Sequence, residues 1–247
     1  ISSVRAAILA IAAILVSALL DATPTNELPL TVMTFNIRTS GSDDKENAWP
    51  KRRELVSETI SRFSPHVIGL QEVLSEQIEY LETSLPNYRW LGADRGLNGG
   101  TGLSEHTPIF YRHTELVPIE FGNFWLSSTP DSPTGSGWRR NVSRIVTWAQ
   151  FHHLSTNRRF HVFNTHLTLR RGQRQVNSAK MIASRVASLP QGSVVIVTGM
   201  LREREIPLKA VVFLCNVRRQ LLVCAGSEVS QVDEVSLPSD RWGRSSR

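Results

Sequence analysis

The sequence has few cysteines and no repeated segment, and these absences limit the class of protein that it encodes. Its two cysteines, Cys215 and Cys224, lack the spacing to nearby histidines that a zinc site has, which argues against metal binding through sulfur. In an exported protein the two thiols could instead pair and close a short loop. No long low-complexity tract is visible, and the aromatic residues do not recur at the spacing of a base-stacking platform. A dedicated nucleic-acid-binding module is therefore the least favoured interpretation.

Length and composition favour one globular domain of the larger α/β kind. The chain has 247 residues, of which 40% are hydrophobic and 20% charged, as is ordinary for a protein with one sizeable core. Its formal net charge is +6 and its pI is about 9.9. A basic surface attracts phosphate-bearing partners, nucleic acid among them. A generally basic, solvated surface explains the same charge, so the charge alone identifies no partner.

The N-terminal segment resembles a secretory signal peptide. Arg5 precedes the apolar run Ala6–Leu20, which only Ser17 interrupts, and a cut after Ala22 would make residues 1–22 the signal. We therefore expect a secreted protein without a stable membrane span, because spanning needs about 20 apolar residues. A short membrane anchor is the alternative. In an exported eukaryotic protein, the sequon at Asn141 would carry a glycan.

Apolar periodicity predicts strands that alternate with helices and also strands that follow one another directly. This pattern indicates a layered α/β sandwich of mixed β-sheets flanked by helices. Residues 91–106 are rich in glycine and are expected to form a surface loop. Strands are expected at 30–36, 66–72, 107–112, 116–125, 145–153, 160–167 and 193–198, and helices at 50–63, 75–84 and 173–188.

Polar side chains follow several of these expected strands. Asn36 and Glu72 each end an apolar strand, and His166 ends another. Ligands of open α/β sheets collect outside the carboxyl ends of the strands. A carboxylate and an amide suit Mg²⁺, which usually takes one or two carboxylates and keeps several waters. A histidine there could donate a hydrogen bond to a phosphoryl oxygen or carry a proton near neutral pH.

Several motifs, taken in order, resemble the endonuclease/exonuclease/phosphatase superfamily, which includes deoxyribonuclease I and exonuclease III. The resemblance covers about residues 30–199, and it implies a layered fold of the deoxyribonuclease I kind and hydrolysis of phosphate esters with Mg²⁺, or with Mn²⁺ in its place. The motifs are Thr34-Phe35-Asn36-Ile37-Arg38, Gly69-Leu70-Gln71-Glu72-Val73, Pro108-Ile109-Phe110-Tyr111-Arg112, Asn164-Thr165-His166-Leu167 and Val194-Val195-Ile196-Val197-Thr198-Gly199.

The resemblance also implies roles for particular residues. It makes Glu72 the principal metal ligand, with Asn36 beside it in the metal and phosphate site. It places Glu105 in the wall of the site and Tyr111 and Arg112 near its phosphate-facing rim. The full set of expected site residues is His166, Asn164 and Tyr111 as catalytic groups, Asn36, Arg112, Glu105 and Arg144 as substrate-binding groups, and Glu72 and Asn36 as metal ligands.

The pattern of the family breaks after Gly199. The family continues with Asp-x-Asn, in which the aspartate orients the attacking water, whereas this chain has Met200 and Arg202 at the corresponding positions. A thioether neither accepts a proton nor binds Mg²⁺ usefully. No histidine follows His166, so the final Ser-Asp-His motif is also lost. We interpret residues 30–199 as an incomplete domain and 200–247 as a divergent tail, produced by a shifted reading frame or a retained intron, with the last strands missing or replaced.

The expected function is therefore a secreted, Mg²⁺-dependent phosphoester hydrolase with an incomplete active site. A catalytically inactive family member that still binds phosphorylated ligands is the first alternative, and a basic nucleic-acid-binding module is the second. Selectivity among nucleic acids, inositol phosphates, sphingomyelin and sugar phosphates lies in loops that vary freely within a fold. The sequence predicts neither the substrate nor the oligomeric state.

Overall fold

The computed structural model describes residues 30–96, 104–132, 144–167, 173–200, 212–216 and 221–224 of the chain. Strands and helices alternate up to α3, and five strands then follow one another before the last helix. In chain order the elements are β1 (Thr31–Asn36), the 3₁₀ helix η1 (Lys45–Asn47), α2 (Trp49–Phe63), β2 (Val67–Gln71), α3 (Ser75–Ser84), β3 (Tyr88–Leu91), β4 (Ile109–Arg112), β5 (Leu116–Trp125), β6 (Ile145–His153), β7 (Arg158–His166), α4 (Gln173–Ala187), β8 (Val195–Met200), β9 (Val212–Asn216) and β10 (Leu221–Cys224).

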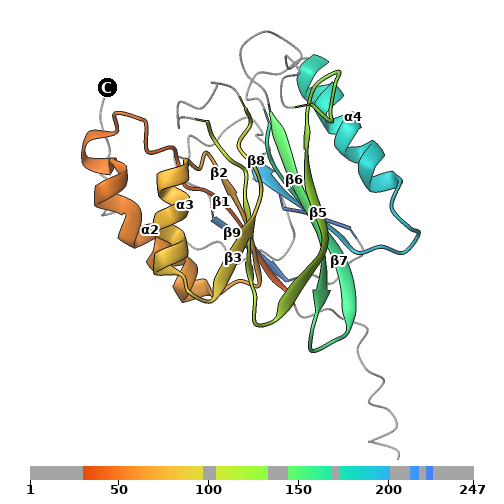
Figure 1. Cartoon of the computed structure of the whole chain (residues 1–247), viewed down its shortest axis with the longest axis horizontal. Coiled ribbons are helices and arrows are strands. Elements are labelled where there is room, and N and C mark those ends of the chain that lie inside the picture. The colour runs from red at the N-terminus through yellow and green to blue at the C-terminus, as the bar shows by residue number, and fades with distance from the viewer. Residues whose placement is uncertain are drawn as a thin grey trace, which may run out of the picture.

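Two mixed β-sheets form the centre of the molecule. The first sheet has the strand order β3-β4-β2-β1-β9 and the second has the order β10-β8-β7-β6-β5. Each sheet has a parallel pair near its middle, β1 with β2 and β7 with β8, and antiparallel strands on both sides of the first pair but only on the β6 side of the second. Figure 1 shows α2 and α3 outside the first sheet and α4 outside the second. The predicted layered α/β sandwich is confirmed.

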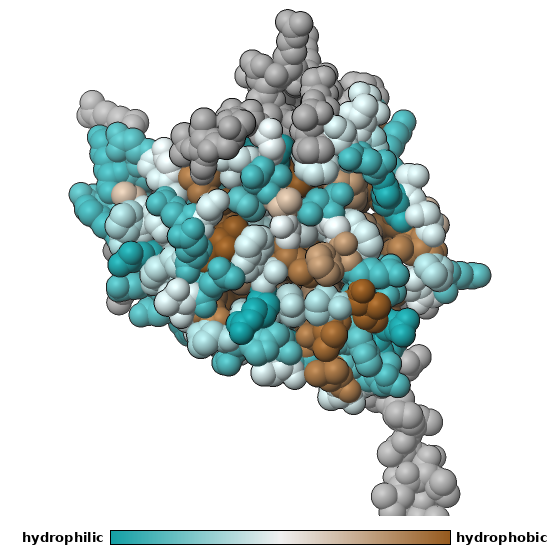
Figure 2. Space-filling model, in the orientation of Figure 1, coloured by the Kyte–Doolittle hydropathy of each residue, from teal (hydrophilic) through white to brown (hydrophobic). Residues whose placement is uncertain are grey.

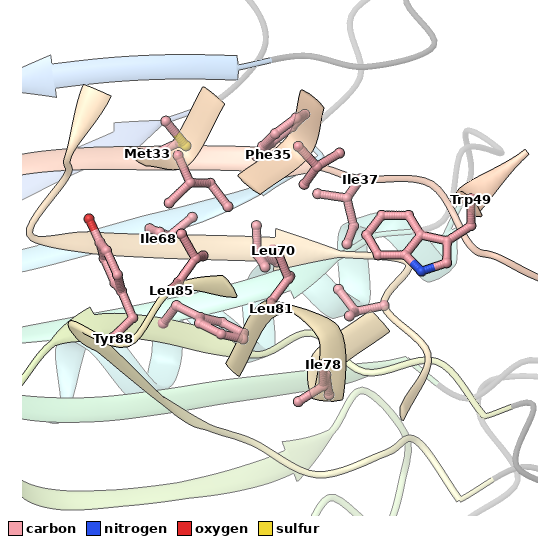
Figure 3. Packing of buried hydrophobic residues seen from close by; sticks show 14 residues of the cluster. Met33, Phe35, Ile37, Trp49, Ile68, Leu70, Ile78, Leu81, Leu85 and Tyr88 are labelled. Carbon is pink, nitrogen blue, oxygen red and sulfur yellow. The ribbon is translucent and has the colours of Figure 1, made fainter. Parts of the chain in front are cut away.

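Apolar side chains fill the spaces between these layers. One buried cluster lies between the two sheets and includes Val32, Val67, Phe151 and Val162. A second packs the first sheet against α2 and α3, and Figure 3 shows its members Phe35 and Leu70 on the strands and Leu81 on the helical side. A third packs the second sheet against α4. The two sheets are thereby held face to face, so that strand ends from both of them meet at a common rim.

Most expected elements lie within a few residues of their predicted bounds. The helix expected at 50–63 is α2, the helix expected at 75–84 is α3, and the strands expected at 116–125 and 145–153 are β5 and β6. The loop expected at 91–106 instead begins after an edge strand, β3, that the periodicity did not indicate. From the tail, β9 pairs antiparallel with β1, and β10 pairs parallel with β8. The tail thus contributes a strand to an edge of each sheet.

A buried polar network joins the two sheets just beneath the ends of their central strands. Asn164 on β7 is fully buried, and its amide nitrogen donates to the carbonyl oxygens of Leu70, at 2.8 Å, and Pro108, at 2.9 Å. Its amide oxygen accepts from Gln71 Nε2 at 2.9 Å and from Thr198 Oγ1 at 3.0 Å. All the polar atoms of this side chain therefore have partners within the protein.

The same network depends on the absence of a side chain at Gly69. A Cβ atom there would lie 2.1 Å from Thr198 Oγ1 and 2.6 Å from Asn164 Oδ1. The network continues to Thr34 on β1, whose hydroxyl oxygen accepts from Gln71 Nε2 at 3.2 Å and from the Gly199 backbone N–H at 3.2 Å. The central strands of both sheets are thus fixed in register immediately below the rim.

The outer surface carries apolar side chains mainly on the edge strand β5. Val117, Ile119 and Phe121 are exposed there, and Phe121 keeps 59% of its surface accessible. Figure 2 shows apolar patches set among hydrophilic side chains on the face seen in Figure 1. Within the part of the chain that the structure describes, no helix has the length and apolarity needed to cross a membrane.

Candidate active site

The rim at the carboxyl ends of β1, β2 and β7 brings together Asn36, Glu72 and His166. Asn36 Nδ2 donates a hydrogen bond to Glu72 Oε1 at 2.9 Å, and His166 Nε2 lies 3.9 Å from the same carboxylate oxygen. Asn36 and His166 are both 5% exposed. The structure thus unites the amide, the carboxylate and the imidazole at one place, as the positions of the strand ends predicted.

Backbone conformation and hydrogen bonds hold the Glu72 carboxylate in position. Glu72 has a φ of 60°, a left-handed conformation that is uncommon for a residue other than glycine and that recurs at functional sites. The backbone N–H of Thr39 approaches Glu72 Oε2 at 3.4 Å. The Asn36 amide is oriented in turn, because its Oδ1 accepts from the Arg38 backbone N–H at 2.9 Å. Asn36 therefore presents its N–H group to the carboxylate.

The loop between β1 and α2 is fixed by side chains from both neighbouring helices. Arg52 of α2 is buried and donates to the carbonyl oxygens of Ile37, Arg38 and Asn47. Gln77 of α3 donates from Nε2 to the Arg38 carbonyl oxygen at 2.9 Å. One wall of the rim is therefore rigidly attached to the helical layer.

The imidazole of His166 is neutral at physiological pH. Burial, together with the positive charge of Arg144, lowers the pKa of His166 to about 4, against the opposing effect of Glu72. Both ring nitrogens are buried and have no hydrogen-bond partner among the described residues. A neutral ring donates one hydrogen bond and accepts another, which favours the role of hydrogen-bond donor over that of a proton carrier near pH 7.

We expect the protein to lose stability as the pH falls below about 6.5. Burial lowers the pKa values of His106 and His166, so below 6.5 these imidazoles take up protons in the unfolded chain while the folded chain still resists protonation. Between pH 6.5 and 5, His166 alone should remove about 2 kcal/mol of unfolding free energy, since one pKa unit corresponds to about 1.4 kcal/mol. Urea unfolding at pH 7.5 and 5, with chelator present, measures this loss. In His166→Gln the pH dependence should shrink by that amount, and an unchanged slope would contradict the assignment.

Two arginines and a glutamate line the same rim. Arg95 Nη2 lies 2.8 Å from Glu105 Oε1, and the Arg95 backbone N–H donates to the Glu105 carbonyl oxygen. Arg144 is largely buried, and both burial and the charge of Arg95 lower its pKa, against the opposing effects of Glu105 and Glu72. Glu105 and Arg144 therefore lie in the rim as predicted. Arg95 was not predicted, and its place within a glycine-rich segment gave no pattern that could have identified it.

Comparison with known proteins assigns this arrangement to a family. The profile described as the endonuclease/exonuclease/phosphatase family matches residues 33–199. The chain belongs to this family. Members of the endonuclease/exonuclease/phosphatase family act on phosphate esters and generally depend on divalent metal ions. No curated protein matches the chain.

Solved structures of the family are similar to this chain. An endonuclease/exonuclease/phosphatase from Bacteroides vulgatus is 31% identical, with a TM-score of 0.65, over 70% of this chain and 66% of its own. A mannosyl-6-phosphatase from Bacteroides thetaiotaomicron is 29% identical, with a TM-score of 0.63, over 69% of this chain and 64% of its own. The chain thus spans slightly less than two thirds of the length of these structures.

The structure does not bring Tyr111 and Arg112 to the rim. Strand β4 runs antiparallel to β2 and pairs Tyr111 with Val67, so the end of β4 lies at the opposite pole of the sheet. Tyr111 packs on Phe151 between the sheets, with ring centroids 5.1 Å apart. Arg112 is bonded to Glu115 and to backbone carbonyl oxygens of the segment that precedes β2. Their placement at the phosphate-facing rim is therefore wrong.

Asn164 also lies away from the rim. It is on the same face of β7 as His166 but two residues deeper, where the cross-sheet network uses its whole amide. A side chain in that state has no group to offer to a substrate. The structure therefore contradicts the expected catalytic role of Asn164 and gives it a structural role in supporting the strands beneath the site.

A second cluster at the opposite pole has the spacing of a metal site but not its protonation state. Ligand atoms of His66, Glu115 and His153 all lie within 4.8 Å of one another. However, the Thr31 backbone N–H donates to His66 Nδ1 at 2.9 Å, so the proton of the neutral ring resides on Nε2 and points to Glu115 Oε2, 3.0 Å away. In this hydrogen-bonding state His66 offers no lone pair to a metal, and this cluster does not support the predicted Mg²⁺ site.

The residues at the rim do fit a hard dication. Glu72 supplies one partly buried, oriented carboxylate, and Mg²⁺ commonly binds through one or two carboxylates, waters and substrate phosphate. The orphaned imidazole of His166 beside this carboxylate is consistent with a site completed by a ligand. Asn36 directs its N–H toward Glu72, so its contribution here is to orient the carboxylate.

Proposed function

We propose that this chain is a secreted, Mg²⁺-dependent phosphoester hydrolase with an incomplete active site. The observation that carries the proposal is the buried imidazole of His166, which has no hydrogen-bond partner among the described residues and lies beside the carboxylate of Glu72. Burying a polar ring without a partner costs free energy, and such a cost persists where a ligand repays it. Membership of a family of phosphoesterases supports a phosphate ester as that ligand.

Each residue at the rim has a distinct part in this reaction. Asn36 orients the Glu72 carboxylate, which would hold the metal ion. Bound there, Mg²⁺ supplies Lewis-acid chemistry that polarises the phosphoryl oxygen and stabilises the leaving oxygen. The neutral His166 donates a hydrogen bond to a non-bridging phosphoryl oxygen. Arg144 adds positive charge on the same side, where negative charge is concentrated during phosphoryl transfer.

The incomplete part of the site is at the end of β8. Residue 200 pairs with His166 in the ladder between β7 and β8, so the position where the family has its aspartate lies at the rim. Methionine there leaves the attacking water without a base, which typically lowers a rate by about 10²–10⁴-fold. Arg202 lies outside the described residues. We therefore propose a slow hydrolase. If turnover were lost entirely, the chain would still bind phosphorylated ligands.

We expect Glu72→Gln to abolish metal-dependent hydrolysis. The amide keeps the shape of the side chain but removes the charge that holds the dication. Removing a group that only supports a metal ligand costs roughly 10–100-fold in activity, so the loss of turnover here should be larger. The measurement is turnover of a generic aryl phosphate with Mg²⁺ and with chelator. Glu82→Gln, a matched change of an exposed glutamate on α3, should leave turnover unchanged.

The outcome separates the candidate functions. Chelator-insensitive turnover, or equal turnover in Glu72→Gln and in the unchanged protein, would reject the proposal. Absence of turnover together with retained phosphate binding would instead support the alternative of a non-catalytic protein that binds phosphorylated ligands. Expression of the full chain in a secreting host tests export in the same experiment, because an exported protein is recovered from the medium and lacks residues 1–22. Those residues and the sequon at Asn141 lie outside the described part of the chain.

A further inference from the structure

The rim contains buried hydrogen-bond donors that no acceptor in the described part of the protein satisfies. They are Nε of Arg95, Nε and Nη1 of Arg144, and a nitrogen of the His166 ring. A guanidinium group has donors only, so these groups together require acceptor atoms from a ligand. Since buried polar groups are nearly always hydrogen-bonded, their concentration in one place identifies a site for an oxygen-rich anion.

These donors are held in place before any ligand arrives. Glu105 takes the Nη2 end of Arg95 at 2.8 Å, which leaves the Nε–H group facing elsewhere. Two neighbouring residues at the end of β5 hold both arginine backbones. Trp125 Nε1 donates to the Arg95 carbonyl oxygen at 3.2 Å, and the Leu126 N–H donates to the Arg144 carbonyl oxygen at 2.8 Å. Glu105 is thus a positioning residue for the guanidinium group of Arg95, and the backbone of Arg144 is fixed nearby.

The charges at the rim indicate the charge of the ligand. Glu105 neutralises Arg95, and Glu72 is committed to the dication, so Arg144 has no carboxylate of its own within the described residues. Half of the charge of the dication and the whole charge of Arg144 remain uncompensated. A dianion balances them, whereas a monoanion would leave a buried positive charge.

We propose that Arg95 and Arg144 select a phosphomonoester dianion over a phosphodiester at this site. A phosphomonoester carries a charge of about −1.5 to −2 at pH 7 and has three acceptor oxygens. A diester has one charge and two non-bridging oxygens, so it offers less charge and fewer acceptors to both arginines, His166 and the metal ion. This inference rests on the proposed function, whose metal and phosphate site it shares, and it adds the substrate class.

Isothermal titration calorimetry with inorganic phosphate and with dimethyl phosphate tests the selection without turnover. We expect the unchanged protein with Mg²⁺ to bind inorganic phosphate at least tenfold more tightly than it binds dimethyl phosphate. Arg144→Gln should weaken phosphate binding by roughly 10–100-fold, which corresponds to the free energy of the charge-assisted hydrogen bonds that it removes. The same change should weaken dimethyl phosphate binding by much less. Arg144→Lys should recover part of the loss, because it restores the charge but not the paired donors. Arg62→Gln, on the exposed face of α2, is the matched control and should change neither affinity.

Thermal unfolding without ligand distinguishes a binding role from a structural one. An unpaired buried charge costs stability, so Arg144→Gln should unfold at the same or a higher temperature than the unchanged protein while it binds phosphate more weakly. A lower unfolding temperature, or equal losses of affinity for both anions, would overturn the inference. Either result would leave the test of Glu72 and metal dependence intact, so the two proposals fail separately.

Discussion

Replacing Met200 with aspartate is expected to raise the rate of phosphoester hydrolysis at least tenfold. The β7–β8 ladder sets residue 200 opposite His166, two residues beyond Thr198, so a carboxylate introduced there enters the rim that holds Glu72. A positioned general base typically contributes about 10²–10⁴-fold, and the lower end is expected because Arg202 and the divergent tail remain. Initial rates with an aryl phosphate monoester and Mg²⁺ measure the gain.

The control for this gain is Met200→Asn, which has nearly the shape of aspartate but no charge and no basicity. If Met200→Asn gained as much as Met200→Asp, removal of the methionine and not the carboxylate would be responsible, and the reasoning about the missing base would be wrong. The double variant Met200→Asp/Glu72→Gln should fall back to the background rate, because the new base acts only on a water aligned with the metal-bound phosphate. This combination ties the gained activity to the proposed site.

The rim was predictable where strand ends alone determine position. Asn36 and Glu72 follow apolar runs that pair in parallel, and parallel strands bring their carboxyl ends to the same edge. His166 ends β7, which lies across the sandwich from these strands. The second sheet faces the first through a continuous apolar cluster, so the histidine reaches the same rim. Local pattern and resemblance were sufficient for these residues.

Arg112 shows where the prediction failed and why. The family resemblance placed Arg112 near the phosphate-facing rim, but the sequence pattern does not reveal the direction of its strand. Because β4 runs antiparallel to β2, its carboxyl end lies beside the segment that precedes β2, and Arg112 bonds there to Glu115. Hydrophobic periodicity indicates that a strand exists but not which way it runs in the sheet. Strand direction had to come from the three-dimensional structure.

Arg95 and β3 were missed because the local sequence has no periodicity to read. Tyr88–Leu91 is a four-residue edge strand whose residues are buried, exposed and partly buried in succession. Arg95 then lies in a loop, where its position depends on contacts with Glu105 and Trp125 that are distant in the sequence. Buried arginines of this kind are recognised by their unmet hydrogen bonds, and these are visible only after folding.

Asn164→Leu is expected to reduce the unfolding free energy by about 3–5 kcal/mol. Leucine is close to asparagine in size and shape, so the loss reports the missing hydrogen bonds. The substitution leaves the Leu70 and Pro108 carbonyl oxygens, Gln71 Nε2 and Thr198 Oγ1 without their shared partner in a fully buried layer. Each unmet buried group costs about 1–3 kcal/mol, although part of this cost is relieved by relaxation. Urea unfolding at pH 7.5 measures the change.

The matched control, Asn87→Leu, changes an exposed asparagine before β3 and should alter the unfolding free energy by less than about 0.5 kcal/mol. The comparison decides between the two roles considered for Asn164. If Asn164→Leu kept the stability of the unchanged protein but lost phosphate binding, the side chain would act on the ligand, as the family resemblance implied. If stability falls, phosphate binding weakens only as the folded fraction does, because the amide supports the strands that carry Glu72 and His166 without touching the ligand itself.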